Sequence, residues 1–247
     1  MRDTGYSVNE IVRYSLEDGI ATITIDDGKR NALPPPVLKA IHRAFARARA
    51  DRAAVVLTGR EDVFSAGFDL NVMKRGGPDA LRMLYGGYSL PARVLTHPRP
   101  VVAACNGHSF AMGVFLMLGA DYVIGSEGDF GIAANEVAIG LKMPRVAAAM
   151  LRHRLTPATY QRAVALAEKF DPDAAVAAGF LDEVVAPAEL AKRATEKIHE
   201  LKALHFHAHM KSKRRIRRSL VRKLKASVPL DLVDALWMGI RGGGPRQ

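Results

Sequence analysis

Several features that would assign a chain to a familiar class are missing here. The 247 residues include one cysteine, Cys105, so an internal disulfide is excluded. Cys105 ends the apolar run VVAAC, and we interpret it as a small buried side chain in a reducing setting. No apolar run approaches the roughly 18 residues of a membrane span, and the polar start MRDTGYSVNE lacks the apolar part of an export signal. These absences predict a cytoplasmic protein that does not act in a membrane.

Motifs for metals and common cofactors are also missing. The sequence has no CxxC, no HExxH, no Walker loop and no strand-bound GxGxxG. His205, His207 and His209 alternate in LHFHAHM, but no cysteine or carboxylate accompanies them, so a solvated helical stretch is favoured over a metal site. Ser65 in FSAGF lies outside any GxSxG pattern, which argues against a nucleophilic serine. We therefore expect no metal and no separate cofactor.

The net charge of +11 comes from one segment. Residues 211 to 225 (KSKRRIRRSLVRKLK) hold nine Lys or Arg and no acid, which leaves 27 basic against 25 acidic residues elsewhere. Ile216, Leu220 and Leu224 recur at helical spacing, so the segment predicts a helix with one apolar stripe. The favoured interpretation is the solvated face of a docked helix. A site for ligand phosphates is the alternative, and nucleic acid or an anionic membrane is less favoured because no aromatic residues interleave the charges.

The order of apolar segments predicts an α/β fold. Two β-rich runs flank Asp18-Gly19, a strong hairpin signal, and further strands and helices alternate until about residue 145. Beyond that point the pattern is mostly helical, apart from a strand-like segment at 181 to 185. The predicted strands are 11–16, 20–25, 54–58, 101–105 and 122–124, and the predicted helices are 38–48, 78–95 and 111–120. We divide the chain into a core, 1–190, and a helical region, 191–247, in which Leu236 and Trp237 could dock on the body or on another subunit.

Two glycine-bearing turns follow buried strands and can point backbone donors into a cleft. The first lies in VVLTGREDVFSAGFDL, residues 55 to 70. The second lies in RPVVAACNGHSFAMGVFLMLGADYVIG, residues 99 to 125, where a helix begins near Ala111. Because the first N–H groups of a helix have no partner within it, such a turn suits an oxyanion.

These two turns, followed by NEVAIGLKMP and AVAAGFLDEVV, resemble in order four segments of the enoyl-CoA hydratase/isomerase (crotonase) family. The likeness spans residues 20 to about 187 and is close to bacterial paralogues that read AMG in place of three glycines. It implies a crotonase-like spiral of β-β-α units with a helical C-terminal region, assembled as a homotrimer or hexamer. It also implies an acyl-CoA substrate of fatty-acid metabolism, with coenzyme A as part of the substrate. No nucleic-acid or membrane partner is expected.

The resemblance assigns roles to individual residues. The peptide N–H groups of Phe68 and Met112 match the pair that holds the thioester oxygen in the family. Family hydratases use two glutamates; one of these positions is Glu136 here, and the other is Phe115, which cannot transfer a proton. Asp121 matches a family aspartate that we take to be structural.

Substrate contacts are expected around the same turns. Lys29 and Arg30 stand where the family places basic contacts to the nucleotide, and the segment 73–88 is expected to form a wall of the acyl site. The basic segment 211–225 is the alternative contact for the phosphates of coenzyme A. The complete set of expected substrate contacts is Lys29, Arg30, Ala66, Gly67, Asp69, Tyr85 and Phe115.

One carboxylate with an oxyanion hole is the set that moving a double bond requires. We therefore favour isomerisation of 3-enoyl-CoA to 2-enoyl-CoA, with Glu136 as the catalytic residue. Two alternatives remain: a 2-enoyl-CoA hydratase that uses another acid, and a non-catalytic acyl-CoA-binding protein.

Overall fold

A six-stranded sheet forms the base of the fold in the computed structural model, which describes residues 11–240. The strand order is β1 (Val12–Glu17), β2 (Ile20–Ile25), β4 (Ala54–Thr58), β7 (Val101–Cys105), β9 (Tyr122–Ser126) and β11 (Glu183–Val185). β1 is antiparallel to β2, and the other neighbours are parallel. Asp18 and Gly19 have φ values of +49° and +71°, as the predicted hairpin turn requires. Residues 1–10 and 241–247 lie outside the described part.

A second, smaller sheet consists of three parallel strands, β5 (Asp62–Ser65), β8 (Gly107–Phe110) and β10 (Ile132–Ala133), with β8 in the middle. β3 (Ala32–Leu33) and β6 (Gly67–Phe68) form a separate, short pair of parallel strands. After β2, β4, β7 and β9 of the large sheet, the chain enters a strand of one of the two smaller sheets (β3, β5, β8 and β10 in turn) and then a helical element. This arrangement confirms the predicted spiral of β-β-α units.

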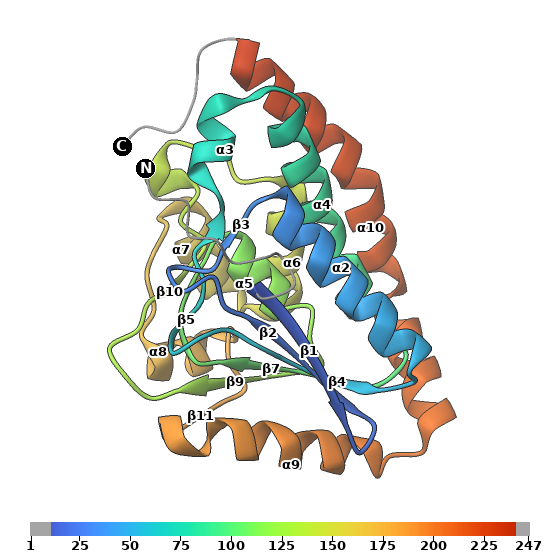
Figure 1. The fold of residues 1–247 in the computed structure, drawn as a ribbon. Helices are drawn as coiled ribbons and strands as arrows, with labels where there is room; N and C mark the ends of the chain where they lie inside the picture. Colours follow the sequence, from blue (N-terminus) through green and yellow to red (C-terminus); the bar gives the residue numbers. More distant parts are fainter. Residues whose placement is uncertain (1–10, 241–247) are drawn as a thin grey trace.

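Helices cover both faces of the large sheet (Figure 1). On one face, α9 (Leu190–Lys202) packs Leu190, Ala194 and Ile198 against the sheet. On the other face lies the main core, which includes α2 (Pro35–Ala50), α4 (Gly77–Leu95), α5 (Met112–Met117) and α6 (Arg145–Arg154). The remaining helical elements are α3 (Leu70–Arg75), η1 (Val137–Ile139), α7 (Pro157–Ala165), α8 (Pro172–Ala178) and η2 (Pro187–Glu189). α3 was not predicted, and α5 ends three residues before the predicted helix does.

The basic segment belongs to the long helix α10 (Phe206–Ile240), which packs along α4 and α6. The prediction of a docked helix is confirmed, but the predicted apolar stripe is wrong at Ile216, which is 71% exposed. Lys213 and Arg217 take the inward positions instead, because they bind Asp121. Leu220 and Leu224 are buried as expected.

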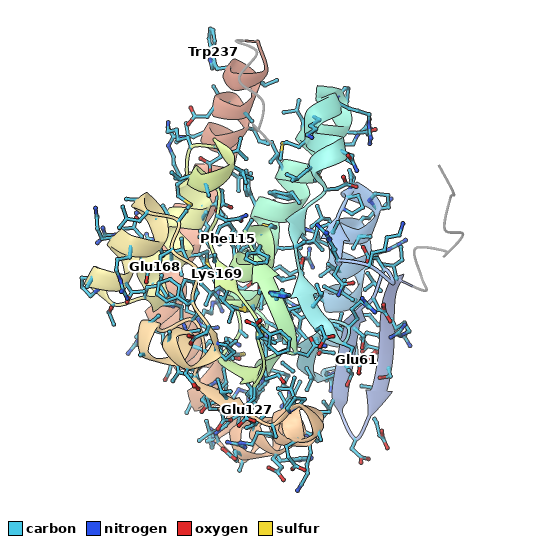
Figure 2. The ribbon with its side chains drawn as sticks, turned by 90° about the vertical axis from the view of Figure 1, so that its left-hand side faces the viewer. Glu61, Phe115, Glu127, Glu168, Lys169 and Trp237 are labelled. Atoms are coloured by element: carbon cyan, nitrogen blue, oxygen red, sulfur yellow. The ribbon has the colours of Figure 1, made fainter. Side chains whose placement is uncertain are left out.

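Two large apolar side chains near the end of α10 are exposed. Leu236 and Trp237 are 47% and 57% exposed, and Trp237 stands at the outer end of the helix (Figure 2). The histidines of LHFHAHM lie at the start of α10, and no cluster of three potential metal ligands occurs within residues 11–240. Over the same residues, no helix combines the length and apolar character needed to cross a membrane.

Candidate active site

Three parallel strands end side by side and deliver the candidate site residues. β5, β8 and β10 run in the same direction, so the segments that follow them emerge at one edge of the small sheet. The segment 66–68 follows β5, Ala111 and Met112 follow β8, and the segment 134–136 follows β10. The Ala111 N–H donates to the carbonyl oxygen of Ala133 at 3.0 Å and joins the second and third of these segments. Residues that are far apart in the sequence are thereby brought together.

The two glycine-bearing turns touch at Gly67. This residue has a φ of +85°, and a β-carbon placed on it would lie 2.9 Å from the Phe110 carbonyl oxygen and 3.1 Å from the Met112 nitrogen. A side chain at this position would push the turns apart, so glycine is required both by its backbone conformation and by the close approach. Ala111 also has a positive φ, +48°, and this turn starts α5 at Met112.

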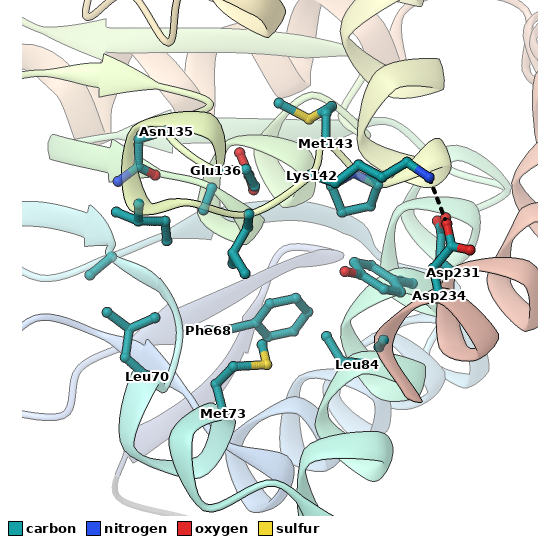
Figure 3. A pocket seen from close by; sticks show the side chains of 17 residues that line it. Phe68, Leu70, Met73, Leu84, Asn135, Glu136, Lys142, Met143, Asp231 and Asp234 are labelled. Atoms are coloured by element: carbon teal, nitrogen blue, oxygen red, sulfur yellow. Dashed lines mark hydrogen bonds and ion pairs between the residues drawn. The ribbon is translucent and has the colours of Figure 1, made fainter. Parts of the chain in front are cut away.

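A largely apolar cavity of about 120 Å³ opens beside these turns (Figure 3). Phe68 enters it from β6, and Glu136 enters it from the position directly before η1. The cavity is also bounded by α3, α4, the loop before α6, and α10. Its lining residues are Ala66, Phe68, Leu70, Met73, Leu84, Tyr88, Ala111, Asn135, Glu136, Ile139, Leu141, Lys142, Met143, Pro144, Asp231, Asp234 and Ala235.

Glu136 is a buried carboxylate with no counter-ion in the part of the chain that the structure describes. It is 6% exposed, and its Oε2 atom has no hydrogen-bond partner among residues 11–240. Burial disfavours the charged form and raises the pKa of Glu136 to about 7, against a small opposing effect of a backbone hydrogen bond. A carboxyl group with a pKa near neutrality can both accept and return a proton.

Gly87 on α4 leaves room for the bulky side chains of Phe68 and Met112. A β-carbon on Gly87 would lie 2.2 Å from Cε1 of Phe68 and 3.3 Å from Sδ of Met112. The Phe68 ring also meets Tyr88 edge to face, with centroids 5.5 Å apart. Burial raises the pKa of Tyr88, so its hydroxyl stays protonated at neutral pH. Phe68, Tyr88 and Gly87 thus form one packed wall of the cavity.

Charged groups gather at the other end of the cavity. Asp234 on α10 binds Lys142 at 3.1 Å and Arg145 at 2.7 Å, and the first of these pairs is drawn in Figure 3. Asp231 accepts hydrogen bonds from the backbone N–H groups of Arg145 and Val146, both at 2.9 Å. These contacts hold the C-terminal helix against the start of α6 and close this side of the cavity.

The structure brings together the central predicted residues. Glu136, Phe68 and Ala66 line the cavity, and Gly67 and Met112 form the contact between the turns. Asp69 instead caps α3, where its side chain accepts from the N–H groups of Asn71 and Val72 at 2.8 Å and 3.2 Å.

The other expected contacts lie outside the lining. Tyr85 is 59% exposed and Phe115 is 1% exposed, the latter within the core (Figure 2). The side chains of Lys29 and Arg30 do not line the cavity, although the Arg30 carbonyl oxygen accepts from the Ala66 N–H at 2.9 Å.

The segment 73–88 was expected to wall the acyl site, and its Met73, Leu84 and Tyr88 line the cavity, whereas Tyr85 does not. Leu84 and Tyr88 share one face of α4 because they lie four residues apart. Sequence reasoning missed the lining residues that come from α10. Asp231 and Asp234 come from α10, about one hundred residues after Glu136, and no local pattern connects them to the site.

This chain is similar to known proteins both in sequence and in fold. Residues 15–232 match the family model described as enoyl-CoA hydratase/isomerase. The solved structure of an enoyl-CoA hydratase/isomerase family protein from Pseudomonas syringae is 41% identical, with a TM-score of 0.89 over 92% of this chain and 98% of the other. An enoyl-CoA isomerase of Mycobacterium tuberculosis is 40% identical, with a TM-score of 0.86 over 90% and 98%. The carnitinyl-CoA dehydratase of Salmonella typhi is 30% identical over 198 residues, 78% of this chain and 75% of that protein. The matched region contains all three strand ends around the cavity.

Proposed function

The chain belongs to the enoyl-CoA hydratase/isomerase family, whose members act on CoA thioesters, and from this premise we propose that it converts 3-enoyl-CoA to 2-enoyl-CoA. The observation that carries the proposal is the single unpaired carboxylate in the cavity, Glu136. Solved structures about 40% identical are named both enoyl-CoA isomerase and enoyl-CoA hydratase, so the choice of reaction rests on the residues of the site.

The reaction needs one group that moves a proton between two carbons. Glu136, as a carboxylate, takes a proton from C2 of the 3-enoyl thioester, and the electron pair moves onto the thioester oxygen. In this proposal the N–H groups of Phe68 and Met112 hold that oxyanion. One such donor contributes about 3 to 4 kcal/mol to the transition state in comparable oxyanion holes. The carboxylic acid then returns its proton to C4, and the double bond forms between C2 and C3.

The other acidic groups near the cavity support isomerisation over hydration. Hydration ordinarily needs a second acid or base, and the position matched to it holds Phe115, which is buried in the core. Asp231 and Asp234 line the far end of the cavity, but both are bound to Arg145. Among the carboxylates of residues 11–240, only Glu136 combines a place in the lining with an unpaired buried oxygen.

Absorbance measurements test this reaction directly. Purified protein is mixed separately with a 3-enoyl-CoA and a 2-enoyl-CoA, because conjugation to the thioester makes absorbance rise on isomerisation and fall on hydration. We expect absorbance to rise with 3-enoyl-CoA. This rise should be lost in Glu136→Gln and kept in Glu127→Gln, which is a control at an exposed glutamate.

Two results would overturn the proposal. A fall with 2-enoyl-CoA at an enzymatic rate, without isomerisation, would identify a hydratase that uses another acid. No change with either substrate, together with acyl-CoA binding in calorimetry, would identify a non-catalytic binding protein.

The proposal includes the assembly and setting of the enzyme. We place it in cytoplasmic fatty-acid metabolism as a homotrimer or hexamer, as the family resemblance implies. Lys29 and Arg30 are proposed to meet the nucleotide part of coenzyme A. Arg30→Ala should therefore raise KM for the acyl-CoA, and Arg43→Ala, at an exposed cation of α2, is the control. Light scattering during size exclusion would contradict the assembly if it gave the mass of a monomer.

A further inference from the structure

A basic groove lies between three helices and is separate from the acyl cavity. α2, α4 and α10 lie side by side (Figure 1). Residues of all three helices line a groove with a volume of about 260 Å³. On α4, Tyr88 lines the acyl cavity, whereas the next residue, Ser89, lines this groove. The proposed isomerisation uses none of the residues in the groove.

Each of the three helices contributes one cation to the groove. Arg49 comes from α2, Arg93 from α4 and Lys225 from α10, and no carboxylate lines the groove. None of the three has an ion-pair partner within residues 11–240, and all three are exposed. Lys213 and Arg217, earlier on α10, are by contrast neutralised by Asp121. The groove therefore carries an unbalanced positive charge.

Two histidines add no charge of their own at neutral pH. The Nε2 atoms of His42 and His97 lie 2.9 Å from the carbonyl oxygens of Gly86 and Ala53, and because a carbonyl only accepts, Nε2 carries the proton. Burial, with a contribution from Arg93, lowers the pKa of His42. Burial lowers the pKa of His97 to about 4, with further lowering by neighbouring cations. The positive charge of the groove thus comes from Arg49, Arg93 and Lys225.

We propose that this groove is a second binding site, and that it takes the phosphate group of a phosphorylated small molecule. Arginine presents paired N–H donors that match phosphate oxygens, and lysine adds a mobile point charge. The volume is many times the roughly 10 to 15 Å³ that one water needs on the same measure, which leaves room for a phosphate group and part of its carrier. Phe45 and His97, in edge contact with centroids 6.0 Å apart, form a fixed apolar floor.

Calorimetric titration of the whole protein with inorganic phosphate at constant chloride concentration tests the proposal. We expect saturable binding that weakens about tenfold or more in Arg93→Gln and in Lys225→Glu, because each removes a charge-assisted contact. Arg222→Gln is the matched control, since Arg222 is an exposed cation of α10 outside the groove. Thermal melts of each variant establish that it is folded.

Two further titrations identify the source of the phosphate. Tighter binding of adenosine 3′,5′-bisphosphate than of inorganic phosphate, lost in Arg93→Gln, would indicate a nucleotide. Equal binding of both would indicate free phosphate. Because the readout is binding, it does not depend on whether the protein isomerises enoyl-CoA.

Other outcomes overturn the proposal. Absence of saturable binding would do so, as would equal weakening in Arg222→Gln, which would show a general surface charge effect. A change in oligomeric mass in Lys225→Glu without any phosphate binding by the unaltered protein would assign the groove to subunit contacts instead.

Discussion

The ammonium nitrogen of Lys213 lies 2.6 Å from Oδ2 of Asp121, and both side chains are less than 10% exposed. Arg217 completes the group at 2.9 Å from the other carboxylate oxygen. Asp121 also accepts the N–H of Val101 at 2.8 Å, at the start of a central strand. One carboxylate therefore joins the basic helix α10 to the sheet and the end of the α5 segment.

Replacement of this carboxylate should destabilise the protein strongly. Asp121→Asn leaves two buried cations without a counter-ion, and breaking a buried pair in this way costs about 3 to 5 kcal/mol. Urea unfolding measures the change. Asp79→Asn is the control, because the Asp79–Arg82 pair is 66% and 70% exposed and such pairs contribute about 1 kcal/mol or less. Similar losses in both variants would contradict a buried network.

Glu136→Gln should stabilise the protein at alkaline pH. The folded pKa of Glu136 is raised from 4.5 to about 7, so between these values the folded protein keeps a proton that the unfolded chain has lost. Stability therefore falls as pH rises through this window, and above pH 7 the buried charge costs on the order of 3 kcal/mol. We expect the variant to exceed the wild type by that amount at pH 8 and to match it near pH 4. Unfolding curves of both proteins at the two pH values measure this difference. If the variant and the wild type differed in free energy of unfolding by the same amount at both pH values, the raised pKa of Glu136 would be contradicted.

Turnover should follow the ionisation of the same group. Only the carboxylate form of Glu136 can remove the C2 proton, so kcat/KM for a 3-enoyl-CoA should rise with pH and level off above an apparent pKa of about 7. A pH series of initial rates measures this. A profile that is flat between pH 5 and pH 9 would show that another group takes the proton.

Gly67→Ala should impair catalysis beyond its effect on folding. A β-carbon here approaches the Met112 nitrogen to 3.1 Å, so the two turns must separate and the oxyanion donors lose their alignment. We expect kcat to fall about 100-fold or more, as for the loss of one oxyanion-hole donor. Gly76→Ala is the control, since Gly76 also has a positive φ, +64°, but its β-carbon would meet no atom within 4 Å. If Gly67→Ala and Gly76→Ala lowered kcat equally, backbone strain alone would explain the effect.

Gly86 and Gly87 should respond in opposite directions to alanine. Alanine in a helix is ordinarily favoured over glycine by about 0.5 to 1 kcal/mol, and at Gly86 the new β-carbon would make ordinary contacts of 3.5 Å with Leu38. At Gly87 it would lie 2.2 Å from the Phe68 ring, which must move into the acyl cavity. We expect Gly86→Ala to be neutral or stabilising, and Gly87→Ala to lower the melting temperature and raise KM. Equal melting temperatures and KM values would argue against the packed wall.

Much of the fold was predictable because its signals are local. The strands 20–25, 54–58 and 101–105 were predicted with the observed bounds, since short apolar runs are separated by turn residues such as Asp18-Gly19. The roles of Glu136, Phe68 and Met112 stay predictions that rest on matched motifs, although the structure gathers all three around one cavity edge.

Other features depend on contacts that no local pattern contains. Helical spacing placed Ile216 in the apolar stripe of α10, but Asp121 supplies a buried acceptor about ninety residues earlier, so Lys213 and Arg217 face inward instead. The same holds for Asp231, which reaches the acyl cavity only because α10 folds back onto α6.

The sequence by itself determined the strands of the large sheet, the helices α2 and α4, the two glycine turns and the family, because the signals for each lie in residues close together in the chain. Only the tertiary structure decided which face of α4 meets the acyl cavity, that Phe115 lies in the core, and that Arg49, Arg93 and Lys225 share a groove. Burial, raised pKa values and unbalanced charge arise from neighbours in space, and those neighbours come from distant segments that packing alone brings together.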